Sequence, residues 1–112
     1  MELQTEQLPL NIDKVNLIGK MDLAGSERID IKLNALAGIS QKLIIDMEQV
    51  SFLASMGIRS LIMSAKVVQR NGGKILILKP NADVEQVLTS SGTDTLIPIF
   101  HDLEAAISTL SL

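Results

Sequence analysis

Cysteine, tryptophan and tyrosine are absent from this sequence of 112 residues, and phenylalanine occurs only twice. Without cysteine the chain can form no disulfide, no thiolate metal site and no cysteine nucleophile. So few aromatic side chains leave little surface for the base stacking that single-stranded nucleic-acid binders use. A basic excess is also missing, since the net charge is −3. The composition therefore argues against nucleic acid as a partner, because nothing offsets the charge of phosphates.

Targeting and membrane-spanning segments are missing as well. The amino-terminal residues Met1 to Glu6 are acidic and polar, whereas a signal peptide begins with basic residues and continues with apolar ones. No apolar run approaches the ~20 residues that a membrane span requires. We therefore expect a cytoplasmic protein with no membrane span, and the lack of cysteine suits a reducing compartment.

What the chain does contain is typical of one globular domain. Hydrophobic residues make up 46% and charged residues 21% of the sequence, which is enough to bury an aliphatic core and keep a charged surface. The length fits a single domain over residues 1–112.

Hydrophobic periodicity predicts strands that alternate with helices. Strands are predicted at 2–10, 15–19, 43–45, 74–78 and 96–100, with a turn at 11–14 and a loop at 47–54. Helices are predicted from the segment 22–26 to Ala37, from Ser55 to Asn71, between Pro80 and Gly92, and from Asp102 to Leu110. This order predicts an α/β fold: a mixed, mostly parallel sheet of about five strands, its first strand antiparallel, with about four helices packed mainly on one face.

In such folds, binding sites collect where strands end and helices begin. Two of these junctions carry distinctive residues. The first is Gly19-Lys20-Met21-Asp22, and the second runs from Asp46 to Gly57.

The second junction carries a resemblance to a known family. Its pattern, an apolar residue, Asp46, four residues, Ser51-Phe52, an apolar residue, Ala54, Ser55, Met56 and Gly57, is similar to that of the STAS-domain anti-sigma-factor antagonists of bacteria. The first junction matches the Gly-x-apolar-Asp motif of the same family. The order of elements matches from about Leu8 to the carboxyl terminus.

The resemblance implies a regulatory protein without enzyme activity. A family member binds an anti-sigma factor that is also a serine kinase, is released when that kinase phosphorylates it, and is reset by a metal-dependent serine phosphatase. It needs no cofactor, because the ATP belongs to the kinase. The acceptor serine of the family's Asp-Ser-(Ser/Thr)-Gly motif corresponds to Ser55. Ala54 replaces the usual Asp, and Met56 replaces the second hydroxyl residue.

The predicted site combines this acceptor with a partner-binding patch. The patch comprises Met21, Asp22, Ala54, Ser55, Met56 and Gly57, with Met21 and Met56 as an adaptable contact surface. Simpler structural roles stay open, because Ser55 and Asp22 are both good helix N-caps. Asp46 is expected to end a buried strand and bond to nearby backbone N–H groups. Met63 is expected to fill the core.

Two rival functions remain. The first is a STAS module in a lipid-transport, chemotaxis-like or stressosome assembly that does not act on a sigma factor. The second is a small enzyme that uses Asp22, Asp46 and His101. His101 is the single histidine, and it has no second ligand with metal-site spacing. The sequence does not predict an oligomeric state.

Overall fold

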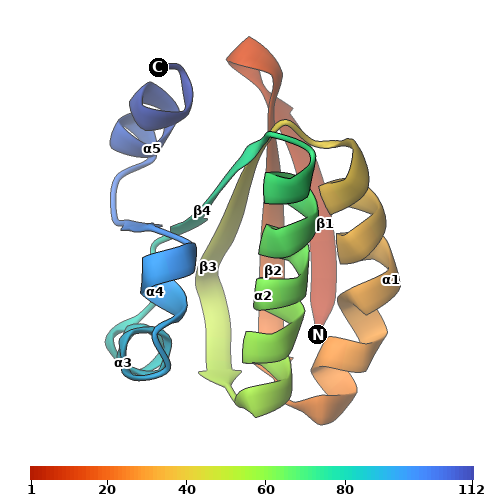
Figure 1. The fold of residues 1–112 in the computed structure, drawn as a ribbon. Coiled ribbons are helices and arrows are strands. Elements are labelled where there is room, and N and C mark those ends of the chain that lie inside the picture. The colour runs from red at the N-terminus through yellow and green to blue at the C-terminus, as the bar shows by residue number, and fades with distance from the viewer.

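A five-stranded sheet with helices on both faces organises the computed structural model, which describes all 112 residues (Figure 1). The strands are β1 (Glu2–Leu8), β2 (Ile12–Met21), β3 (Lys42–Leu53), β4 (Lys74–Leu78) and β5 (Ile99–Phe100). The helices are α1 (Leu23–Ile39), α2 (Ser55–Arg70), α3 (Ala82–Ser90), the single turn α4 (Thr93–Leu96) and α5 (Leu103–Leu110). A 3-10 turn, Pro9–Asn11, joins β1 to β2. No helix combines the length and apolar character needed to cross a bilayer.

The strands lie in chain order, β1-β2-β3-β4-β5. β1 pairs antiparallel with β2, and every other neighbouring pair is parallel. Parallel neighbours require a crossover, which a helix supplies in each case. The predicted α/β class, with a mixed sheet and an antiparallel first strand, is confirmed.

Two apolar layers enclose the sheet. The larger one, beneath α1, α2 and α3, joins 19 buried residues of the helices and the strands. The smaller one lies on the opposite face, where α5 packs Ala106 and Leu110 against Ile44, Leu76 and Leu78. Figure 1 shows α1 and α2 side by side in front of the sheet, with α5 apart from them beyond β4. The prediction of helices mainly on one face is confirmed, with α5 as the exception.

The predicted loop at 47–54 is wrong, because β3 continues to Leu53. Two register shifts explain the error. Between Asn16 and Ile18, and again between Gly19 and Lys20, β3 contains one residue more than the segment of β2 that pairs with it. Each bulge breaks the alternation of period two. The buried residues Met47, Val50 and Leu53 are therefore three positions apart, a spacing that resembles a loop more than a strand.

Two other predicted boundaries also move. The turn expected at 11–14 lies earlier, over Pro9–Asn11, where Leu10 and Asn11 have φ angles of 68° and 59°. The last strand, expected at 96–100, is only Ile99–Phe100, because Thr93–Leu96 forms a helical turn. A strand of two residues pairs with only the end of β4.

Candidate partner-binding site at the carboxyl edge of β2 and β3

The two junctions lie side by side at one edge of the sheet. Met21, the last residue of β2, is paired with Leu53, the last residue of β3. The backbone N–H of Ala54 donates a hydrogen bond of 3.1 Å to the carbonyl of Met21. Asp22 and Ser55 therefore begin their helices at the same edge, although 33 positions separate them in the sequence.

The first junction is closed by a side-chain cap. Asp22 is the N-cap of α1, and its Oδ1 accepts a hydrogen bond of 2.8 Å from the backbone N–H of Gly25. This bond satisfies one of the free donors of the first helical turn. The structural role that the sequence allowed for Asp22 is thus present, and its half-buried carboxylate remains at the edge that Ser55 shares.

The second junction lacks such a cap. Ala54 is the N-cap of α2, and no side chain accepts a bond from the backbone N–H groups of the first turn. Ser55 is the first helical residue, its side chain is exposed, and its hydroxyl makes no hydrogen bond within the protein. The interpretation of Ser55 as an N-cap is therefore wrong. Its hydroxyl stands free at the positive end of the helix dipole.

Gly57 and Met21 support this edge from beneath and do not belong to its surface. Both are buried. A Cβ added at Gly57 would lie 2.6 Å from Cγ of Met21 and 2.7 Å from Cδ1 of Leu53. Gly25 holds the matching place in α1, three residues after the N-cap, and a Cβ there would collide with the carbonyl of Lys20. The expectation that Met21 and Gly57 offer contact surface is corrected: they let the helices approach the strand ends closely.

The accessible part of the edge is partly apolar. Ser55 is exposed, and Ala54 and Met56 are half-buried beside it. Phe52 is 50% exposed and Leu23 is 54% exposed. Sequence reasoning missed Phe52 and Leu23 as surface residues, because Phe52 fell in a predicted loop and Leu23 in the segment predicted to start a helix. Apolar side chains grouped at an edge are typical of a protein-binding surface.

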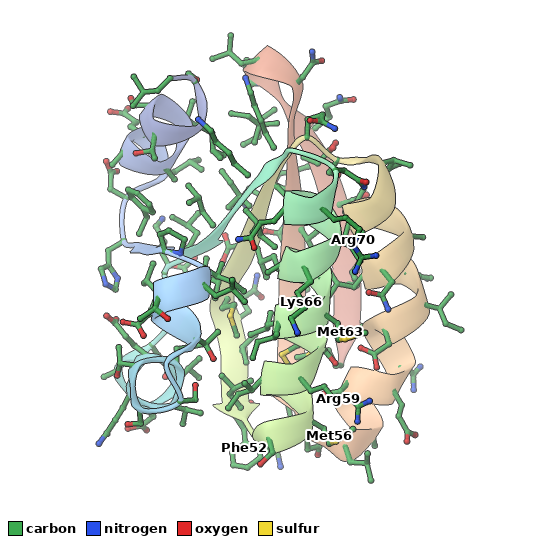
Figure 2. The ribbon with its side chains drawn as sticks, in the orientation of Figure 1. Phe52, Met56, Arg59, Met63, Lys66 and Arg70 are labelled. Carbon is green, nitrogen blue, oxygen red and sulfur yellow. The ribbon has the colours of Figure 1, made fainter.

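A second missed feature is the outer face of α2. Arg59, Lys66 and Arg70 lie on it, and α2 contains no acidic residue. Met63, which the sequence assigned to the core, is 46% exposed on the same face. Figure 2 shows these side chains along the helix, with Met56 near its amino-terminal end and Phe52 beside that end. The sequence signal for this face is the spacing of seven positions from Arg59 to Lys66 and four from Lys66 to Arg70, outside the apolar stripe of the helix.

Asp22, Asp46 and His101 do not form one site. Asp22 caps α1, whereas Asp46 Oδ2 lies 3.2 Å from Nζ of Lys14 and its Oδ1 accepts a bond of 2.9 Å from the backbone N–H of Glu48. His101 Nε2 lies 3.1 Å from Oε1 of Glu85. Asp46 therefore has the structural role expected of it, within β3 and not at its end.

Lys14 and Glu6 complete the polar cluster around Asp46. Lys14 Nζ lies 3.0 Å from Oε1 of Glu6. The hydrogen bond from Lys14, assisted by one from Asn16, holds the pKa of Glu6 below its ordinary value of 4.5. Burial opposes the charge of Lys14, but its hydrogen bonds to Glu6 and Asp46 prevail and raise its pKa above 10.5. These pKa shifts belong to a cluster that links β1, β2 and β3, not to the edge around Ser55.

The fold and this edge define an α/β domain that presents an unpaired serine hydroxyl on a partly apolar surface. The sequence pattern of the STAS domain matches residues 6–106, and the chain belongs to this family. The resemblance suggested by the two junction motifs is thereby confirmed.

The chain is also similar to individual proteins that are described as anti-sigma factor antagonists. The protein described as "Putative anti-sigma factor antagonist BtrV" of Bordetella bronchiseptica is 23% identical over 106 residues, 88% of this chain and 91% of that protein. The unphosphorylated anti-sigma factor antagonist SpoIIAA superposes with a TM-score of 0.80 at 21% identity, covering 99% of this chain and 98% of that one. Its phosphorylated form, from Bacillus, has a TM-score of 0.73 at 21% identity, covering 96% and 99%.

The same fold also occurs in a transporter. The STAS domain of a SulP transporter from Vibrio cholerae is 25% identical, with a TM-score of 0.72, and covers 92% of this chain and 83% of that one. The family therefore contains domains that serve different assemblies.

Proposed function

We propose that this protein is a cytoplasmic protein-binding switch. Unphosphorylated, it binds an anti-sigma factor that is also a serine kinase. Phosphorylation at Ser55 releases it, and a serine phosphatase resets it. The observation that carries the proposal is the exposed hydroxyl of Ser55, free of hydrogen bonds at the first position of α2. The anti-sigma factor antagonists BtrV and SpoIIAA among its relatives support it.

The contact surface in this proposal surrounds Ser55. Asp22 contributes a carboxylate, and Ala54 and Met56 contribute apolar surface on either side of the serine. Met21 and Gly57 act from below, by holding the start of α2 against the strand ends. A surface that is built on helices and strands is held more precisely than one built on loops.

Phosphorylation then changes charge without changing the fold. The Oγ of Ser55 attacks the γ-phosphorus of ATP in the kinase, the bond to ADP breaks, and the hydroxyl proton passes to a base of the kinase. The product carries about −1.5 to −2 charges at pH 7. Free N–H groups and the helix dipole stabilise an anion at this position. The helix therefore survives, while a partner surface matched to a neutral serine and the nearby Asp22 is repelled.

The decisive experiment uses the purified chain with the anti-sigma factor kinases of its source organism, each expressed singly. We expect one of them to bind the chain and, with ATP and Mg²⁺, to add one phosphate that mass spectrometry locates at Ser55. Release from the complex should accompany the modification. Ser55→Ala should bind and fail to be released. Phosphorylation elsewhere, or no binding to any such kinase, would contradict the proposal.

A second candidate function follows from the transporter match. A STAS module can serve another assembly without any sigma factor, as the SulP transporter domain illustrates. This alternative gains support if the chain binds no anti-sigma factor and instead co-purifies at fixed stoichiometry with one component of such an assembly.

A further inference from the structure

The outer face of α2 carries three cations that take part in none of the ion pairs of the protein. Arg59, Lys66 and Arg70 have no ion pair: the three ion pairs of the protein link Lys14 to Glu6, Lys14 to Asp46, and His101 to Glu85. The whole chain has thirteen acidic and ten basic side chains. Helix α2, by contrast, has three cations and no acidic residue. Clustered charge of one sign raises the local concentration of oppositely charged partners and speeds their association.

Apolar side chains interleave these cations. Met63 is 46% exposed, Met56 is half-buried, and Phe52 is 50% exposed at the end of β3 next to α2 (Figure 2). Between α1 and α2 the surface is hollowed by about 310 Å³. The hollow is lined by Asp30, Asn34, Met56, Arg59, Ser60 and Met63. Flexible methionines beside a hollow suit the insertion of an apolar side chain from a partner.

The length of this face indicates how long a helix of the partner it could hold. With a rise of about 1.5 Å per residue, Arg59 and Arg70 stand about 16 Å apart along α2. A partner helix of about three turns laid along α2 matches this length, with its apolar residues on the methionines and its carboxylates opposite the cations. A membrane or nucleic acid fits less well, because the chain has a net charge of −3, and phosphate binders carry a basic excess.

We infer that the outer face of α2 (Met56, Arg59, Met63, Lys66 and Arg70) is a docking surface for an acidic amphipathic helix of the anti-sigma factor. This inference rests on the proposed function and extends it. Ser55 lies one helical turn before Arg59, so the docking surface begins at the serine that the kinase modifies. The helix holds the kinase on α2 while its active site reaches Ser55.

The test reverses two cations far from Ser55. Lys66→Glu with Arg70→Glu changes the end of α2, and Arg28→Glu with Lys32→Glu is a matched control. The control pair has the same residue types, the same spacing of four and the same charge change. Arg28 and Lys32 line a hollow beside β1, on the side of α1 away from α2. The probe is the anti-sigma factor kinase that binds the wild-type chain.

We expect the Kd of the Lys66→Glu, Arg70→Glu variant to rise at least about tenfold at low salt, since like charges would then face each other. The control should stay within about twofold of wild type. Acid-to-lysine changes in one acidic helix of the kinase should restore binding to the variant and weaken binding to wild type. The wild-type Kd should also rise with salt more steeply than that of the variant.

Several outcomes would overturn the inference without touching the proposed function. In one, wild type binds the kinase and Ser55→Asp releases it, while Lys66→Glu, Arg70→Glu binds as tightly as wild type. In another, the α2 variant and the α1 control lose affinity equally, which indicates a general charge effect. In a third, wild type binds phosphatidylglycerol vesicles or RNA more tightly than the kinase, and the α2 changes abolish that binding. If no kinase binds the wild-type chain, the proposed function fails first, and the docking surface fails with it.

Discussion

The backbone N–H of Ala54 donates a 3.1 Å hydrogen bond to the carbonyl of Met21, and this bond ties the start of α2 to the end of β2. It places two helix starts, one capped by Asp22 and one with no side-chain cap, next to each other. At the capped start, the carboxylate of Asp22 already accepts a hydrogen bond from the backbone N–H of Gly25. At the uncapped start the side chain of Ser55 is exposed and no side chain accepts a bond from the N–H groups of the first turn. The proposed switch uses this difference between the two helix starts.

Gly57→Ala tests the close approach of α2 to the strand ends. The added Cβ would lie 2.6 Å from Cγ of Met21 and 2.8 Å from its carbonyl oxygen. Such overpacking should lower the free energy of unfolding by about 1–3 kcal/mol, measured by urea denaturation. Gly38→Ala, also in a helix but with nothing within 4 Å of the new Cβ, should raise it by about 0.5–1 kcal/mol. Unchanged stability in Gly57→Ala would contradict the close approach of α2 to the strand ends.

Ala54→Asp tests the missing cap. Ala54 has the extended backbone, φ −113° and ψ 179°, that Asp22 has at the start of α1. An aspartate at position 54 should accept a bond from the first turn and raise the free energy of unfolding by about 1 kcal/mol. Asp22→Ala should lower it by a similar amount.

The same variant should bind the kinase more weakly. Its carboxylate would be desolvated against a partner surface that is matched to Ala54 and Met56. Isothermal titration with the kinase measures this change. Tighter binding with faster phosphorylation of Ser55 would show that the partner expects a carboxylate at position 54.

Ser55→Asp separates binding from folding. A negative charge at the first position of α2 interacts favourably with the helix dipole. We therefore expect the free energy of unfolding to stay within about 0.5 kcal/mol of wild type, while affinity for the kinase falls. Gln4→Glu, on the exposed outer side of β1, adds the same charge elsewhere and should leave the affinity unchanged. A large loss of stability in Ser55→Asp would point to release by unfolding.

The polar cluster on the sheet should make stability depend on pH. Because the folded pKa of Glu6 lies below 4.5, its contribution is present above the ordinary pKa and is lost as pH falls through the folded value. Lys14 makes stability depend on pH in the alkaline range, because its pKa is raised on folding. Its contribution to the free energy of unfolding is complete below pH 10.5 and is lost as the pH rises through the folded pKa. Urea denaturation of Glu6→Gln should therefore show a weaker acid dependence than wild type. Equal slopes in the acid range would contradict this role for Glu6.

Much of the fold could be predicted from local pattern. The apolar stripe Ile29, Leu33 and Ala37 marks the buried face of α1, and it is buried in the structure. Asp22 is the N-cap that its position before an apolar helix predicts. Strands that alternate with helices imply a parallel sheet, because parallel neighbours need a crossover. These features follow from residues that are close together in the sequence.

Other features depended on contacts between distant segments. The two bulges that carry β3 to Leu53 exist because β3 follows β2 along its whole length, and no period within residues 47–54 reports them. Met21 is buried because Gly57 lets α2 close over it. Met63 stays exposed because no other helix covers the outer side of α2 at that point.

The sequence by itself thus determined the order of elements, the principal buried stripes and the motif that contains Ser55. Only the tertiary structure decided that the hydroxyl of Ser55 is unbonded, that Met21 and Gly57 are buried, and that the cations of α2 remain unpaired. The physical reason is that periodicity reports which side of a helix is apolar, whereas exposure and pairing depend on which distant residues the fold brings against it.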